Sequence, residues 1–157
     1  MKEDYYREKA LRAKELYDKG LPFVKVYAPV RVGEKFLVLE KENENGPIYY
    51  IAGGGVDDGE TLEQALKREL MEELNVEVDI IKEIGVYDKL YKTWELDGER
   101  FDIQYEMHIF DTKLKKKLDG KFGLDGEFDK GFKIKEIDKS TLISNVAEFR
   151  DFGIKIE

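Results

Sequence analysis

The sequence predicts a mixed α/β fold in a single domain that covers residues 1–157. Three observations predict this fold class. Strand-like alternation fills the middle of the chain, helical patterns flank it, and the dipeptide Asp97-Gly98 between two apolar runs indicates a β-hairpin. A length of 157 residues is near the usual size of one domain, and no repeat or low-complexity linker divides it.

A helical lead-in is expected over residues 1–20. Its apolar positions recur at spacings of four, three and four, at Tyr6, Ala10, Ala13 and Tyr17. Gly20 is placed to end this helix just before Pro22. Simple packing against the domain is the plainest role for the helix, and a dimer contact or a lid beside a substrate are the alternatives.

Strand patterns follow from Phe23 onward. A turn is expected at Gly33-Glu34, a polar loop over residues 42–46, and a charged loop or extended hairpin over residues 112–131. Within that last segment, the basic run Lys115 to Lys117 is expected to face solvent. The expected strands cover residues 23–28, 36–39, 48–51, 78–87, 90–96, 101–110 and 132–137.

Two further helices carry clear terminal signals. For a helix over residues 62–74, Thr61 and Gln64 form a capping-box pattern, and Asn75 tolerates the left-handed conformation that ends a helix. A final helix is expected to begin at Ser140 as N-cap. Its apolar side holds Leu142, Val146 and Phe149.

Composition excludes several function classes. A net charge of −8 argues against duplex nucleic acid and anionic membranes as partners, although small polyanions remain compatible if a metal ion carries them. The chain has no cysteine and one histidine, so it cannot build a thiolate site or a zinc site of several histidines. Charges interrupt every apolar pair near the N-terminus, which predicts no signal peptide or membrane span and a cytoplasmic location by default.

Three carboxylates on the helix of residues 62–74 carry the strongest chemical signal. At about 100° per residue, Glu69 and Glu73 fall within the apolar stripe of that helix and Glu72 flanks it. Such carboxylates would repel one another and resist burial unless a cation lay among them. Oxygen ligands suit a hard ion, so the pattern predicts Mg²⁺, with Mn²⁺ as an alternative. The stripe consists of Leu62, Leu66, Leu70 and Leu74.

Two neighbouring features fit an anion site. Arg68 lies one turn before Glu72 and is expected to orient the acids. The run Gly53, Gly54 and Gly55 supplies a backbone that can bend sharply and approach a phosphate closely. The competing interpretation is an ordinary solvated helix face after a glycine turn, and the joint spacing of the two features weighs against it.

The segment from Gly54 to Val76 resembles the Nudix box, G-x5-E-x7-R-E-u-x-E-E-x-G-u, where u is aliphatic. Eight of the nine defined positions agree, and Asn75 stands where the family has glycine. Because Asn is the next best residue for a left-handed helix terminus, we expect the turn to survive. The matching residues are Gly54, Glu60, Arg68, Glu69, Leu70, Glu72, Glu73 and Val76.

The resemblance implies a Nudix-like α/β/α sandwich with a mixed sheet. It also implies a Mg²⁺-dependent pyrophosphohydrolase acting on a nucleoside diphosphate linked to another group, as in a nucleoside triphosphate, a dinucleoside polyphosphate or a nucleotide sugar. Glu69, Glu72 and Glu73 would bind metal, with Glu69 a base in some members, while Arg68 would hold the glutamates and Glu60 would assist. A catalytically silent nucleotide sensor is the alternative, and a plain acidic scaffold is a third hypothesis. The oligomeric state stays open, including a homodimer.

The resemblance also directs attention to residues outside the box. Family members often add an acid from a variable loop, and Glu127 is the candidate here, in competition with Asp125 and Asp129. Tyr91 and Trp94, together with the nearby Tyr87, are candidates to stack on a base, although at least one of the three is expected in the core. His108 lies in a predicted strand and is expected to be structural and not a catalytic base.

Overall fold

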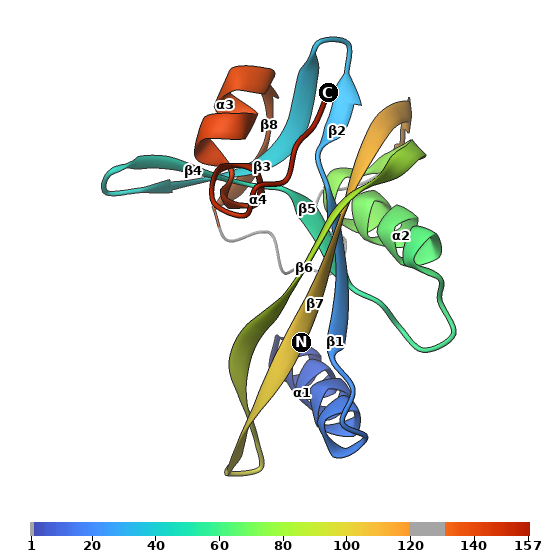
Figure 1. Ribbon diagram of the computed structural model, residues 1–157, viewed down its shortest axis with the longest axis vertical. Helices are drawn as coiled ribbons and strands as arrows, with labels where there is room; N and C mark the ends of the chain where they lie inside the picture. Colours follow the sequence, from blue (N-terminus) through green and yellow to red (C-terminus); the bar gives the residue numbers. More distant parts are fainter. Residues whose placement is uncertain (1, 120–130) are drawn as a thin grey trace.

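The computed structural model describes residues 2–119 and 131–157. One mixed β-sheet runs through the molecule, and helices pack against it, as Figure 1 shows. This confirms the predicted α/β/α sandwich with an N-terminal helix. The helices are α1 (Lys2–Asp18), α2 (Leu62–Leu74), α3 (Lys139–Asn145) and α4 (Ala147–Arg150).

The sheet combines parallel and antiparallel pairs. Its main path runs β4-β3-β2-β7-β1-β5, with β6 paired to β7 and β8 paired to β3. Strands β1 and β2 both run parallel to β7, while the other pairs are antiparallel. The strands are β1 (Phe23–Ala28), β2 (Val30–Val32), β3 (Lys35–Asn43), β4 (Gly46–Tyr50), β5 (Ala52–Gly55), β6 (Val76–Leu96), β7 (Glu99–Lys117) and β8 (Phe132–Asp138).

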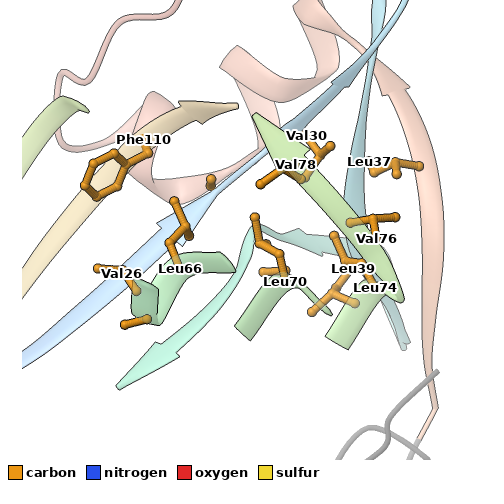
Figure 2. Packing of buried hydrophobic residues seen from close by; sticks show 13 residues of the cluster. Val26, Val30, Leu37, Leu39, Leu66, Leu70, Leu74, Val76, Val78 and Phe110 are labelled. Atoms are coloured by element: carbon orange, nitrogen blue, oxygen red, sulfur yellow. The ribbon is translucent and has the colours of Figure 1, made fainter. Parts of the chain in front are cut away.

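Strand β3 shows how one sheet serves two cores. Leu37 and Leu39 belong to a cluster with α2, whereas Phe36 and Val38 belong to a cluster with α3 and α4. Because successive side chains of a strand point to opposite faces, an unbroken apolar run supplies both layers. In Figure 2 the leucines of α2 project into the first of these cores, toward Val26, Val30, Val76, Val78 and Phe110.

The N-terminal helix α1 buries a different face from the predicted one. Ala10 and Ala13 are buried as expected, but Leu16 completes the buried face. Tyr6 is 51% exposed and Tyr17 is 46% exposed, so the prediction that both lie on the apolar side was wrong. Ala13 and Leu16 pack against an apolar surface formed by β1 and β7. That surface consists of Phe23, Phe101, Ile103, Tyr105 and Met107.

Three strand predictions needed correction. The two strands expected at residues 78–87 and 90–96 form one strand, β6, whose register shifts between Asp88 and Leu90, so pairing with β7 continues across the irregularity. The expected loop at residues 42–46 shortens to a tight turn, since Asn43 already pairs with Gly46. The segment expected to be a loop or an extended hairpin from residue 112 is strand up to Lys117, and Lys115–Lys117 are exposed as predicted.

The C-terminal helical region is also interrupted. Asp138, and not Ser140, caps α3, because its Oδ1 accepts the Thr141 backbone N–H at 2.8 Å. Val146 has an extended conformation (φ −95°, ψ 122°) and separates α3 from α4. The predicted apolar residues Leu142, Val146 and Phe149 are nevertheless all buried. In the described part of the chain, no helix is long and apolar enough to cross a membrane.

Candidate active site

Helix α2 begins and ends as its terminal residues predict. The Thr61 Oγ1 accepts the Gln64 backbone N–H at 3.1 Å, and the Gln64 side chain accepts the Thr61 N–H at 2.9 Å. Asn75 is left-handed at φ 54°, and its N–H donates to the Met71 carbonyl. Leu66 and Leu70 are fully buried against the sheet. These contacts fix the rotation of α2 and therefore the direction in which its carboxylates point.

Glu73 is the most deeply buried acid of α2, with 4% of its surface exposed. Its Oε2 accepts the Gly53 backbone N–H at 3.0 Å, which joins the end of α2 to β5. The sharp bend expected of the glycine run is absent. Gly53, Gly54 and Gly55 instead belong to strand β5 and pair with β1. The backbone of these glycines does approach other atoms closely, but those atoms belong to the protein, namely to Val26, Glu69 and Phe23.

Arg68 organises the acidic groups around it. Its Nε and Nη2 donate to the two carboxylate oxygens of Glu60 at 2.7 and 2.9 Å, and Nη2 also donates to the Gly55 carbonyl at 2.9 Å. Its Nη1 donates to Glu69 at 2.9 Å and lies 3.5 Å from Glu72. The expected pairing with Glu72 is thus the longest of these contacts, and the bidentate bond to Glu60 is the dominant one.

Charge and burial shift the pKa values of this cluster in opposite directions. The hydrogen bond from Arg68 holds the pKa of Glu60 below its ordinary value, and the same bond raises the pKa of Arg68. Burial raises the pKa of Glu69, and the Arg68 guanidinium opposes that rise. The side chain of Glu69 is only 12% exposed. Glu69 is therefore a desolvated carboxylate that Arg68 holds by a hydrogen bond, and Lys9 also interacts with its charge.

A cavity of about 480 Å³ opens beside this cluster. Arg68, Glu69, Glu72 and Gly55 line one part of it, and Trp94 lines another. A volume of this size suits a small-molecule ligand. The loop before α2 and the elements α1, β1, β6 and β7 complete the walls, namely Val56, Asp57, Tyr6, Glu8, Lys9, Arg12, Phe23, Lys25, Lys92 and Tyr105.

The other predicted site residues lie around this cavity or outside it. Gly53, Gly54 and Glu73 line an adjacent hollow of about 400 Å³ that shares Tyr6, Lys9 and Lys25 with the first cavity. Tyr91 is 69% exposed and lies in a separate depression beside Tyr17 and Gln104. Glu127, and the competing Asp125 and Asp129, fall outside the described residues.

The acids near the cavity fit a hard divalent ion in the chemistry of their donors. Only carboxylate oxygens are available there, since the chain has no cysteine and His108 lies elsewhere. Within residues 2–119 and 131–157, no group of three or more acidic or imidazole side chains is placed so that it could hold a metal ion. An ion held by Glu69 and Glu72 would thus keep positions for water and for substrate oxygens, as Mg²⁺ commonly does in proteins.

His108 lies on β7 between two glutamates. Its ring nitrogens are 2.5 Å from Glu83 and 2.8 Å from Glu106. Burial opposes the charged ring, but the two carboxylates outweigh it, so the pKa of His108 is raised. His108 lines neither of the two hollows beside α2, which agrees with a structural role.

Four cations of the cavity wall were not predicted as site residues. Lys9 and Arg12 come from α1, Lys25 from β1 and Lys92 from β6. The sequence places them in three separate elements, on positions typical of solvated lysines and arginines. No spacing rule connects them, so only the packing of α1 and β6 around β1 brings them together.

The chain is similar to known proteins in sequence and in fold. The family model of the NUDIX domain matches residues 22–150. A curated relative, the NAD-capped RNA hydrolase NudC of Pectobacterium carotovorum subsp. carotovorum (strain PC1), is 34% identical over 60 residues. The matched segment is 38% of this chain and 23% of that relative, so the match spans less than a quarter of the relative's length.

Solved structures share the fold at low sequence identity. A NUDIX hydrolase from Nitrosomonas europaea superposes with a TM-score of 0.55 at 21% identity, covering 79% of this chain and 77% of that one. The MutT NUDIX hydrolase from Burkholderia pseudomallei gives 0.53 at 18% identity, covering 74% and 83%. Likeness at these identities concerns the fold alone. Together with the family match over most of the sequence, it leads to one conclusion: the chain belongs to the NUDIX domain family.

Proposed function

We propose that this chain is a pyrophosphohydrolase that cleaves a diphosphate linkage in a small nucleotide-derived substrate. The observation that carries the proposal is the position of Glu69 and Glu72, which line a cavity of about 480 Å³. Arg68 Nη1 lies 2.9 Å from Glu69 and 3.5 Å from Glu72. An acid pair beside a ligand-sized cavity, within a family named for this chemistry, favours hydrolysis over a purely structural role for the acids.

Glu69, Glu72 and Glu73 are the proposed metal-binding residues, with Mg²⁺ as the expected ion and Mn²⁺ as an alternative. The oxygen-only donor set supports this choice. When bound, the ion would polarise the phosphoryl oxygens and offset the charge that develops on the leaving group. Glu127 stays a prediction as a further ligand.

The residues of the chain itself have separate proposed roles. Glu69 is the proposed acceptor of the proton of the attacking water, because its carboxylate lines the cavity and is held in place by Arg68. Arg68 keeps the carboxylates in position through its bonds to Glu60 and Glu69. Glu73 joins α2 to β5 through the Gly53 amide, so it also sets the distance between the acids and the strand.

Recognition of a nucleobase is proposed for Trp94. The indole lies 6.4 Å from the Phe23 ring in a stacked arrangement, and its Nε1 donates to the Tyr105 hydroxyl at 3.1 Å. This holds an aromatic face at the cavity wall, where a base can stack. Gly53, Gly54 and Gly55 remain proposed substrate contacts through their backbone. Tyr91 remains a prediction as well, outside the cavity.

A substrate panel in the presence of Mg²⁺ tests the proposal. It contains nucleoside triphosphates, oxidised nucleotides, dinucleoside polyphosphates, ADP-ribose and nucleotide sugars. NAD-capped RNA is included because a curated relative with 34% identity over 60 residues carries that name. Product phosphates are identified by mass spectrometry, which shows which anhydride bond has broken.

Matched variants separate catalysis from folding. Glu69→Gln and Glu72→Gln are expected to lower the rate by about a hundredfold or more, because each removes a charge that the reaction requires. Glu63→Gln is the control, since Glu63 is an exposed acid in the first turn of the same helix and does not line the cavity. Absence of turnover on every substrate, with nucleotide binding retained, would instead identify a silent sensing module.

A further inference from the structure

Helix α1 forms one wall of the cavity although it lies outside the matched family region, which begins at residue 22. Tyr6, Glu8, Lys9 and Arg12 of α1 all line the same hollow as Glu69. Figure 1 places α1 beside β1 and the long β6–β7 hairpin, on the part of the sheet away from α3. The cavity therefore combines residues of the matched family region with residues that lie outside it.

The position of α1 is well determined by packing and by three ion pairs. Ala13 is completely buried against the sheet. Arg12 bonds to Asp58 in the loop before α2, and Arg7 and Lys14 bond to acids at the tip of the β6–β7 hairpin. Exposed pairs contribute little stability one by one, but three of them directed at two different elements restrict rotation of the helix. Lys9 and Arg12 are thereby held at the cavity.

The cavity wall carries five cationic side chains beside four carboxylates, in a protein whose net charge is −8; the carboxylates are Glu8, Asp57, Glu69 and Glu72. Besides Arg68, which is occupied by Glu60 and Glu69, the wall contains Lys9 and Arg12. The remaining cations are Lys25, whose Nζ is 5.0 Å from the centre of the Tyr105 ring, and Lys92, whose Nζ is 5.2 Å from that of Trp94. These four cations come from α1, β1 and β6, and a polyanion bound among them would interact favourably with each.

Two details connect these cations to a phosphate ligand. Arg12 Nε is buried with no acceptor among the described residues, so the hydrogen bonds of its guanidinium are incomplete. Lys92 makes no ion pair in the described part of the chain. The Lys92 ammonium therefore has capacity to donate, and the Arg12 Nε–H gains an acceptor only if a ligand displaces the atoms that cover it; charged donors bond strongly to phosphate oxygens.

We propose that Lys9 and Arg12 of α1, with Lys25 and Lys92 opposite them, bind the phosphate groups that lie beyond the linkage being hydrolysed. The substrate class would then be a nucleotide with three or more consecutive phosphates, in preference to a diphosphate joined to a neutral sugar. The location of the cleaved linkage rests on the proposed function. The cationic wall is an independent observation, and its affinity for phosphate can be measured without turnover.

Binding is tested first, in the absence of metal ions and of hydrolysis. Calorimetric titration with inorganic tripolyphosphate and with orthophosphate, both in EDTA, measures the affinity of the wall itself. Trp94 is the only tryptophan of the chain and lines the cavity, so a change in its fluorescence reports that the ligand has entered this site. We expect tripolyphosphate to bind more tightly than orthophosphate, with an affinity that falls steeply as salt is added.

A matched pair of double variants locates the interaction on α1. Lys9→Ala with Arg12→Ala is expected to weaken tripolyphosphate binding by about tenfold or more, since two charged hydrogen-bond donors are lost. Lys19→Ala with Lys115→Ala removes the same charge from two exposed positions that neither line the cavity nor form one of the ion pairs that hold α1, and should change binding by less than about twofold. Equal weakening by the two variants would overturn the proposal, and so would a wild-type affinity that does not depend on salt. Lys9→Gln with Arg12→Gln serves if the alanine variant fails to fold.

Turnover then separates this inference from the proposed function. With Mg²⁺, kcat/KM for adenosine triphosphate should exceed that for ADP-ribose, and the ratio should fall only in the variant at Lys9 and Arg12. If no nucleotide is cleaved but tripolyphosphate binding depends on Lys9 and Arg12, the proposed function fails and the cationic wall stands. If cleavage occurs with an unchanged ratio, the inference fails and the hydrolase assignment stands.

Discussion

At the scale of single residues, two adjacent glycines of β5 have different partners. A Cβ on Gly53 would lie 1.9 Å from the Val26 carbonyl oxygen, which belongs to the paired strand. A Cβ on Gly54 would lie 2.5 to 2.6 Å from the carboxylate atoms of Glu69, the end of a flexible side chain. The absence of a side chain at Gly53 therefore allows β5 to pair with β1, and its absence at Gly54 leaves room for the candidate catalytic acid Glu69.

This difference predicts that the same substitution by alanine costs much more stability at Gly53 than at Gly54. Gly53→Ala should lower the free energy of unfolding by about 3 kcal/mol, because backbone cannot yield without separating β1 from β5. Gly54→Ala should cost about 1 kcal/mol or less, because Glu69 can rotate away, but hydrolysis should fall at least about tenfold. Urea denaturation and rate measurements on both variants check the prediction. Comparable stability losses at the two positions would contradict it.

His108 predicts a pH dependence of stability. Its pKa is raised by Glu106 and Glu83 against the opposing effect of burial, so the folded state binds the proton more tightly than the unfolded chain does. The resulting stabilisation is fully present below the unfolded value of about 6.5 and is lost as the pH rises through the folded value. Replacing His108 by Gln should therefore destabilise the protein more at about pH 5.5 than at about pH 8.5.

The measurement is the midpoint of urea unfolding across this pH range. Glu83→Gln is the control, since it removes one of the two carboxylates that face His108 and should reduce the same pH dependence without removing the ring. A His108→Gln effect that is equal at both pH values would show that the contacts of the ring matter and its charge does not.

At the scale of elements, the end of α2 depends on one left-handed residue. Asn75 has φ 54° and is followed directly by β6 at Val76, so this residue sets the angle between helix and strand. Asn75→Gly should leave stability and hydrolysis nearly unchanged, because glycine adopts this conformation freely. Asn75→Ala should cost about 1 kcal/mol, because a Cβ disfavours positive φ. Thermal melts of both variants, with circular dichroism to confirm the fold, distinguish the two results.

Element α2 is also where sequence reasoning was most complete. Its bounds, its capping box and its left-handed end were all predicted correctly, because these depend on residues within a few positions of one another. The strands β6 and β7 were predicted in part. Their hairpin turn at Asp97-Gly98 was recognised, but the continuity of β6 past Asp88 depends on pairing with β7 and not on its own pattern.

At the scale of the whole molecule, metal binding should be coupled to folding. If Glu69 and Glu72 bind Mg²⁺ in the folded state, a concentration tenfold above Kd adds about 1.4 kcal/mol of stability and raises Tm by about 3 to 5 °C for a chain of this size. EDTA should reverse the shift. Choline chloride at equal ionic strength should not reproduce it, which separates specific binding from screening of the net charge of −8.

Variants make that test specific to the acids. Glu69→Gln with Glu72→Gln should abolish the Mg²⁺-dependent shift, whereas Glu63→Gln should retain it, because Glu63 lies outside the cavity. A shift of equal size in all three proteins would place the ion elsewhere and reject the proposed ligands.

The sequence by itself determined the parts of this protein that are local. The spacing from Gly54 to Val76 identified the family and the acids of α2, since a capped helix orders its own side chains by its period. The net charge and the absence of cysteine led us to predict that any bound metal is a hard ion with oxygen ligands.

Only the tertiary structure decided what surrounds those acids. The bidentate bond of Arg68 to Glu60, the closeness of Gly54 to Glu69 and the cationic wall from α1 all join residues of different elements. Such contacts depend on how α1 and α2 pack around β1 and β5, which no spacing within one segment specifies. The proposed diphosphate hydrolysis therefore rests on residues of one helix, whereas the proposed binding of a longer phosphate chain rests on residues that packing brings together.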